Sequence, residues 1–196
     1  TMEPIILASG SIRRHEYFKR LYLPFSIMVP GIAETNDACL PPKELACDLA
    51  KRKINAILAP YAGRIPPRWI CAADTLISLD GEVIGKPATR AQAKETLIRL
   101  SGREHEVITA LALFNGKEQK IDCRTNISTV RFAHLLDDEI EWYLDTFEWQ
   151  GSAGAYKVQG LAACFIDNIK GSYSSIVGLP VRDLYRMLRE NGYEYG

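Results

Sequence analysis

The first part of the chain alternates two kinds of apolar spacing. Short apolar runs at residues 4–8 ("PIILA") and 25–29 ("FSIMV") have the pattern of buried strands. Between them, residues 11–21 repeat apolar side chains at helical intervals, and Ser11 is a suitable N-cap. The same spacing predicts a second helix over residues 42–58. Strand and helix therefore alternate from the start.

The middle of the chain predicts a hairpin after a Pro- and Gly-rich loop at residues 59–67. The apolar runs 69–79 ("WICAADTLISL") and 82–86 ("EVIGK") flank Asp80-Gly81. That dipeptide favours a two-residue turn between antiparallel strands. A helix is predicted next, near residues 89–100.

The second half continues the mixture of strands and helices. Two long strand-like runs span residues 105–114 and 126–135, and a helix with an acidic first turn begins near Asp137. Short strands are predicted at residues 163–169 and 172–177. A last helix then starts at a proline, and the whole pattern indicates an α/β protein with a mixed sheet.

Size and charge limit the classes of function. The chain has 196 residues, enough for one domain with a sizeable core, which could have two lobes. Its 24 basic and 24 acidic side chains give a formal net charge of zero. We therefore expect neither general nucleic-acid binding nor binding to an anionic membrane, although a local basic pocket is compatible with these numbers.

Cysteine spacing and hydropathy suggest a compartment. The five cysteines are scattered and none has C-x-x-C spacing, so we expect no disulfide framework or zinc site. The start of the sequence has no signal-peptide pattern, and no apolar run approaches the roughly 20 residues that span a bilayer. These features predict a cytoplasmic protein with no membrane association.

Two arginines fall in the first turn of a predicted helix, where acidic side chains are favoured. Arg13 and Arg14 fall in the first turn of the helix predicted over residues 11–21. Since a helix start carries partial positive charge, two cations there need a compensating partner. Amide groups after "SGS" together with guanidinium groups would bind phosphate oxygens well.

Lys53 lies on the apolar face of its helix, with Leu49, Ala50, Ala56 and Ile57 one turn away on either side. One interpretation is a lysine whose stem packs while its ammonium reaches water. The other is a partly buried ammonium held by an anion. The sequence leaves both open.

Asp74 and Lys86 are the remaining exceptions. Asp74 interrupts the apolar run 69–79, so its carboxylate needs a partner, a metal or a raised pKa, unless it caps a loop at a strand end. A two-residue turn at Asp80-Gly81 would place Lys86 opposite Thr75, although this could equally be an ordinary surface lysine. One polyphosphate would compensate Arg13, Arg14, Lys53 and Lys86 together.

Seven further segments occur, in chain order: "LASGSIRR", "GIAET", "AADT", "GKP", "LSGREHEVIT", "AGAYKVQG" and "GSYSSIVGLP". In this order and spacing they resemble the Maf family of septum-formation-inhibitor-like proteins over residues 5–192, nearly the whole chain. The resemblance implies a single domain over residues 1–196. It further implies an α/β fold like those of Maf and inosine-triphosphatase proteins, with a mixed twisted sheet, flanking helices and two lobes around a cleft.

The implied activity is that of a nucleoside triphosphate pyrophosphatase, a hydrolase of acid anhydrides that releases pyrophosphate and clears unwanted nucleotides. The family also implies a divalent cation, Mg²⁺ or Mn²⁺, and a homodimer. The "QG" after "AGAY" is similar to the branch that hydrolyses dTTP and UTP. Alternatives are a related enzyme for purine or modified nucleotides, and a non-catalytic regulator of septum formation.

The resemblance assigns roles to individual positions. Asp74 matches the proton acceptor, with Lys53 and Lys86 beside it in the catalytic set. Glu34 and Asp74 match acids near the metal. The substrate-binding positions are Ser9, Arg13, Arg14, Lys53, Thr75, Lys86 and Gln159.

Base selection is implied for Arg13, Thr75 and Gln159. A glutamine amide offers a donor and an acceptor together, which suits the O4 and N3–H edge of uracil or thymine. Taken alone, Gln159 could also be a structural amide beside a glycine turn. One departure concerns Gly151-Ser152, which stands where many members have Asp-Lys, so one lysine near the cleft is missing.

Overall fold

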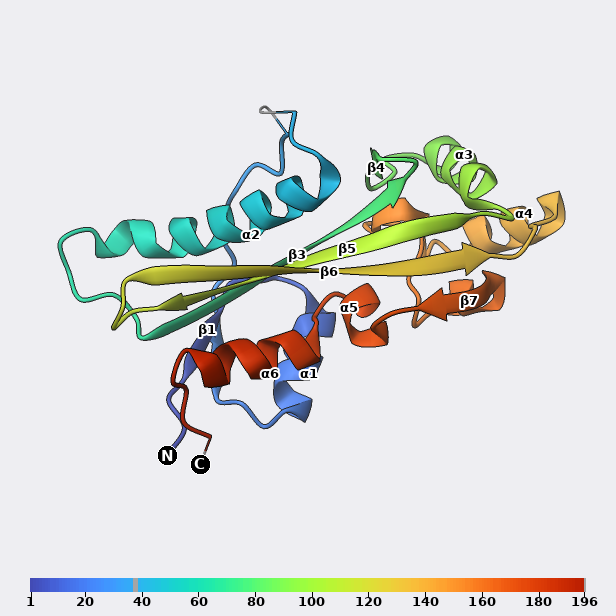
Figure 1. Ribbon diagram of the computed structural model, residues 1–196. Helices are drawn as coiled ribbons and strands as arrows, with labels where there is room; N and C mark the ends of the chain where they lie inside the picture. The colour runs from blue at the N-terminus through green and yellow to red at the C-terminus, as the bar shows by residue number, and fades with distance from the viewer. Residues whose placement is uncertain (37–38, 196) are drawn as a thin grey trace. The chain divides into compact units, whose positions relative to one another are not determined.

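The computed structural model describes residues 1–36 and 39–195 (Figure 1). The strands are β1 (Ile5–Leu7), β2 (Phe25–Ile27), β3 (Trp69–Leu79), β4 (Glu82–Ile84), β5 (Glu104–Asn115), β6 (Lys120–Phe132) and β7 (Ile166–Lys170). The α-helices are α1 (Ile12–Arg20), α2 (Pro42–Leu58), α3 (Arg90–Leu100), α4 (Asp137–Asp145), α5 (Tyr173–Val177) and α6 (Val181–Glu190). Short 3₁₀ helices are η1 (Ala59–Tyr61), η2 (Ala153–Ala155) and η3 (Leu161–Phe165).

The strands form one mixed sheet in the order β2-β1-β3-β5-β6-β7, with β4 paired to β3. Strand β1 is parallel to both of its neighbours, whereas the β3–β4 and β6–β7 pairs are antiparallel. The predicted α/β class with a mixed sheet is confirmed. No helix among the described residues has the length and apolar character needed to cross a membrane.

The chain divides into two compact units. The first comprises Thr1–Asp74, Thr109–Asn126 and Gly178–Gly196, and the second comprises Thr75–Ile108 and Ile127–Val177. Both units include parts of the long strands β3, β5 and β6.

In the first unit, helix α2 covers one face of the strands, and α1 and α6 cover the other (Figure 1). The second of these layers is held by a continuous apolar cluster, because α1 contributes Phe18, α6 contributes Leu184 and Met187, and the strands contribute Leu7 and Trp69. All of these side chains are at most 4 % exposed. The end of β1 and the start of α1 are therefore anchored to a rigid core.

The core of the second unit is rich in aromatic rings. Phe132 packs edge-to-face against Tyr156, with ring centroids 4.9 Å apart, and Phe165 packs against Tyr143 at 5.3 Å. His105 is 2 % exposed and its Nε2 lies 2.7 Å from the Tyr156 hydroxyl. These contacts join β5 and β6 to the segment that follows α4.

Most predicted elements are confirmed, but the end of the chain differs. The predicted strand at residues 172–177 is wrong: α5 occupies Tyr173–Val177. The hydroxyl of Ser172 accepts a hydrogen bond from the Ser175 amide at 3.2 Å, which stabilises a helical turn after Gly171, where φ is +114°. A serine side chain thus competes successfully with strand pairing.

Two strand boundaries also differ from prediction. Residues 161–165 form η3, so the strand predicted over residues 163–169 is reduced to β7. Strand β6 begins at Lys120, ahead of the run predicted to start at residue 126. Side chains at the start of β6 are only half buried, so their pattern is too polar to indicate a strand.

The predicted hairpin has the expected turn and register. Asp80 and Gly81 both have positive φ, as a type I′ turn requires, and Ile77 pairs with Ile84 and Leu79 with Glu82. The paired part of β4 ends at Ile84, two residues before Lys86.

Candidate active site

Ser9 organises the start of α1. It follows β1 directly, and its hydroxyl oxygen accepts hydrogen bonds from the Ser11 amide at 3.1 Å and from Arg14 Nη1 at 3.3 Å. Its carbonyl oxygen lies 2.7 Å from His15 Nε2. Ser11 occupies the predicted N-cap position, but its side chain makes no capping bond. The hydroxyl that supports this helix start therefore comes from Ser9.

Arg14 is buried beside Ser9. The Arg14 Nε donates a hydrogen bond to the Gly178 carbonyl at 2.7 Å, and its Nη1 donates to the Ser9 hydroxyl at 3.3 Å. Both of these acceptors are uncharged groups. Burial lowers the pKa of the Arg14 guanidinium, and the Asp74 carboxylate opposes that shift. A desolvated guanidinium interacts strongly with an anion that comes within reach.

Arg13, the residue before Arg14, is half buried. Its Nε is enclosed and has no hydrogen-bond partner among the described residues. Burial lowers the pKa of this guanidinium as well. An enclosed N–H group without an acceptor costs free energy, so the helix start keeps capacity for a phosphate oxygen.

The structure favours the second interpretation of Lys53, because its side chain is only 10 % exposed and its ammonium contacts a carboxylate. The ammonium lies 2.5 Å from Asp74 Oδ1, 3.4 Å from the Ala73 carbonyl and 3.4 Å from Glu34 Oε1. Leu49 and Ile57, one turn away on either side, are buried with it. Lys53 is thus an enclosed cation between two carboxylates.

Asp74 is 5 % exposed and lies on β3, at the end of the first unit's first segment. Burial raises the pKa of its carboxyl above the ordinary value of an aspartate. Lys53 and Arg14 oppose this rise, whereas the nearby charge of Glu34 adds to it. A carboxylate whose pKa is raised is a stronger proton acceptor than an ordinary aspartate.

The first unit therefore brings together most of the predicted site. Ser9 contacts Arg14, Asp74 interacts electrostatically with Arg14, and Lys53 joins Asp74 to Glu34. Glu34 keeps nearly half of its side chain exposed, so the cluster is open to solvent at that carboxylate.

Three predicted residues belong to the second unit. Thr75 follows Asp74 on β3, Lys86 is exposed after β4, and Gln159 is exposed in the turn before η3. Their roles stay predictions.

The acids of the first unit fit a hard cation in type. Glu34 and Asp74 supply carboxylate oxygens, the donors that Mg²⁺ and Mn²⁺ prefer. No group of three or more His, Cys, Asp or Glu side chains with metal-binding geometry occurs in residues 1–36 and 39–195. A cation held by Glu34 and Asp74 would complete its coordination with substrate and water oxygens.

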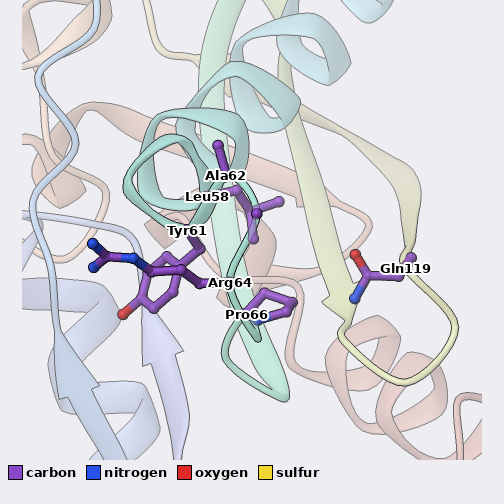
Figure 2. Close-up of a pocket in the computed structure, with 7 residues that line it drawn as sticks. Leu58, Tyr61, Ala62, Arg64, Pro66 and Gln119 are labelled. Carbon is purple, nitrogen blue, oxygen red and sulfur yellow. The ribbon is translucent and has the colours of Figure 1, made fainter.

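A separate cavity of about 270 Å³ lies at the C-terminal end of α2 (Figure 2). None of the residues that line it is a predicted site residue, and the cavity contains no acid–base pair. The lining residues are Leu58, Tyr61, Ala62, Gly63, Arg64, Pro66 and Gln119.

Sequence reasoning missed two partners of this cluster, His15 and the carbonyl of Gly178. His15 follows the arginine pair, but a lone histidine in a helix gives no indication that its ring contacts a backbone carbonyl. Gly178 lies within "GSYSSIVGLP", so only its place in a family motif could have pointed to it.

Comparison with known proteins places the chain in a family. A family model described as Maf-like protein matches residues 4–191. The chain is 43% identical over 192 residues to a dTTP/UTP pyrophosphatase of Symbiobacterium thermophilum, covering 98% of this chain and 96% of that protein. Proteins with the same name from Pelotomaculum thermopropionicum and Pyrococcus abyssi are 41% and 40% identical, covering 98% and 94% of this chain and 98% and 95% of their own lengths.

A solved structure is more distantly similar. It is a nucleoside-triphosphatase / dITP/XTP pyrophosphatase from Mycobacterium abscessus, with a TM-score of 0.42, 14% identity, and coverage of 68% of this chain and 76% of that one. The family model and the relatives, each covering nearly the whole chain, establish that this chain belongs to the Maf-like protein family.

Proposed function

We propose that this chain hydrolyses dTTP and UTP to the nucleoside monophosphate and pyrophosphate. The observation that carries the proposal is the buried Lys53–Asp74 pair beside the Arg14–Ser9 contact. Buried cations around one carboxyl of raised pKa are what phosphoryl chemistry requires, since its catalysis consists mainly of positioning and charge stabilisation. The substrate is taken from the relatives, which are named dTTP/UTP pyrophosphatases.

The triphosphate binds at the start of α1 in this proposal. Arg13 and Arg14 hold phosphate oxygens through their guanidinium groups, with the Ser9 hydroxyl beside them. Lys53 neutralises a further oxygen while it stays close to Asp74. Substrate binding thus adds negative charge at a helix start whose first turn contains no acidic residue.

Asp74 acts as the base. Its ionised carboxyl accepts a proton from a water molecule, whose oxygen attacks the α-phosphorus. The bond from that phosphorus to the oxygen bridging to the β-phosphoryl group breaks, and pyrophosphate leaves with the bond's electron pair. Lys86 is proposed to neutralise the departing phosphates, and Arg13, Thr75 and Gln159 to select the base.

A divalent cation is part of the proposal, as Mg²⁺ or Mn²⁺ held through Glu34 and Asp74. When bound, it would supply positive charge that offsets the negative charge of the phosphates. We further propose a homodimer and a cytoplasmic location. The five cysteines, all within the described residues, have free thiols, which fits a reducing compartment.

The test is a panel of nucleoside triphosphates assayed for pyrophosphate release with and without Mg²⁺. The wild-type chain is expected to favour dTTP and UTP over CTP and the purine nucleotides. Asp74→Asn is expected to lower kcat about 10²-fold or more, because it removes the general base. Asp122→Asn is the matched control, since Asp122 is a half-buried aspartate of the first unit paired with Arg124.

Near-normal turnover by Asp74→Asn would remove Asp74 from the chemistry. Preference for a purine or modified nucleotide would favour the related enzyme instead. Absence of pyrophosphate release from every nucleotide, together with tight and steeply salt-dependent binding of labelled DNA, would favour a non-catalytic regulator.

A further inference from the structure

Within the second unit, the Glu148 carboxylate holds the segment that follows Gln159. Glu148 lies beyond the C-terminus of α4, and its oxygens accept hydrogen bonds from the Leu161 amide at 3.0 Å and the Ala162 amide at 3.4 Å. These amides open η3, where a helix has no internal acceptors for its first N–H groups. A carboxylate at that position satisfies both donors and complements the helix dipole.

Gly160 gives the carboxylate room to do this. A Cβ at Gly160 would lie 2.3–2.6 Å from the Glu148 carboxylate atoms, closer than any real contact. The Gly160 amide also donates to the Lys157 carbonyl at 3.0 Å, which closes a four-residue turn around Gln159. The backbone of Gln159 is therefore fixed by a turn on one side and by Glu148 on the other.

Glu148 is itself held in place. Its amide donates to Thr146 Oγ1 at 3.3 Å, and that hydroxyl donates to the Tyr143 carbonyl at 2.6 Å. The Tyr143 hydroxyl, which donates to the Ala155 carbonyl at 3.0 Å, also faces Glu148. Burial, and then the Glu148 charge, raises the pKa of that hydroxyl. The support thus reaches from the core of the unit to the turn.

The side chain of Gln159 remains exposed although its backbone is fixed. A glutamine amide can pair with uracil or thymine in one orientation and with cytosine in the other, because its donor and acceptor exchange places. Discrimination between these bases therefore depends on how firmly the residue is positioned. A loosely held glutamine would accept several bases.

We propose that Glu148 is a positioning residue for base selection, fixing the turn of Gln159 through Gly160, Leu161 and Ala162. This inference rests on the proposed function, with Gln159 facing the pyrimidine. In that function Glu148 contacts no reacting atom of the substrate, and it acts entirely through the backbone of residues 160–162.

The test compares Glu148→Gln and Glu148→Ala with the wild type, measuring kcat and KM for dTTP, UTP and CTP. Glu141→Gln is the matched control, because Glu141 also holds two partners in the second unit, Arg90 and Lys94, but has no hydrogen bond to the 157–162 segment. Melting temperatures are recorded for every variant.

Both Glu148 variants are expected to raise KM for dTTP and UTP by about tenfold while changing KM for CTP little, so that the selectivity ratio falls. Glu148→Gln should be the milder, since its amide oxygen can still accept one of the two bonds. Glu141→Gln should leave the ratio unchanged. Equal losses on all three nucleotides, or an unchanged ratio, would overturn the proposal.

Gly160→Ala gives a second, independent approach, which also serves if the Glu148 variants fold poorly. Gly160 has φ of −103°, so alanine is compatible with the backbone and acts by displacing the carboxylate. It should reduce the selectivity ratio like Glu148→Ala, and the double variant should be no worse than Glu148→Ala alone. Additive losses would contradict the coupling.

Failure of the proposed function would look different. A wild-type chain that releases no pyrophosphate from dTTP or UTP refutes that function, and the positioning role of Glu148 with it. A selective wild type whose Glu148 and Gly160 variants stay equally selective refutes only this inference.

Discussion

Lys53 and Asp74 depend on each other at the residue scale. Each is buried, and a buried charge without a partner costs several kcal/mol. The sequence indicated both residues through the same violation, a charged side chain on an apolar face or in an apolar run. It could not indicate that they face each other, or that Glu34 joins them from a loop, because those contacts connect distant parts of the chain.

Removal of the Lys53 ammonium should change the titration of Asp74. In Lys53→Met, the pKa of Asp74 loses its largest opposing influence and rises further above that of an ordinary aspartate. If the ionised carboxyl is the base, as proposed, kcat/KM increases with pH through this pKa, so the acidic limb of the profile should move to higher pH.

The measurement is kcat/KM for dTTP against pH, with Lys51→Met as the control, since Lys51 is exposed on the same helix. An acidic limb at the wild-type position in Lys53→Met would show that Asp74 does not control it.

The start of α1 is the informative feature at the element scale. The sequence predicted the helix, its boundaries and its unusual pair of arginines, because these follow from local spacing. It did not predict that Ser9 supplies the supporting hydroxyl, since Ser11 stands at the N-cap position by pattern. Likewise, α5 was predicted as a strand because its apolar residues suit either element, and a serine contact decided the outcome.

Ser9→Ala should therefore destabilise the chain more than Ser11→Ala. The Ser9 change removes the acceptor of the Ser11 amide and of Arg14, with an expected cost of about 1 kcal/mol in the free energy of unfolding. Ser11→Ala should lower the free energy of unfolding by about a few tenths of a kcal/mol at most, because the Ser11 hydroxyl makes no capping bond. Denaturant unfolding of the two variants measures the difference, and equal costs would contradict the assignment.

At the scale of the whole molecule, the sequence predicted a mixed sheet with flanking helices, because periodicity reports which segments are buried. Two lobes were expected, but the sequence could not predict where the chain divides, since β3, β5 and β6 contribute residues to both units and each strand has the pattern of one uninterrupted segment. For the same reason Asp74 and Thr75, adjacent on β3, fall into different units.

The stability of the molecule should depend on His105. Burial lowers the pKa of its imidazole from 6.5 to about 4. Its Nδ1 has no hydrogen-bond partner among the described residues, so no acceptor there would stabilise the protonated ring. Between those two values the unfolded chain binds a proton that the folded chain does not. The free energy of unfolding should therefore fall as pH decreases from 6.5 to about 4, by about 3 kcal/mol in total.

Denaturant unfolding across this pH range provides the measurement. His105→Phe should flatten the pH dependence, whatever its effect on absolute stability, and His134→Phe should leave it intact. A slope that persists in His105→Phe would assign it to other groups.

The bond from Arg14 to the carbonyl of Gly178 has a consequence for how the protein matures. The two residues are 164 positions apart, so the guanidinium can reach that acceptor only after the chain between them has been synthesised. A nascent or prematurely terminated polypeptide has its leading loop and helix yet lacks the backbone group that orients the arginine. The contact that orients Arg14 is therefore completed only once Gly178, just ahead of α6, has been synthesised.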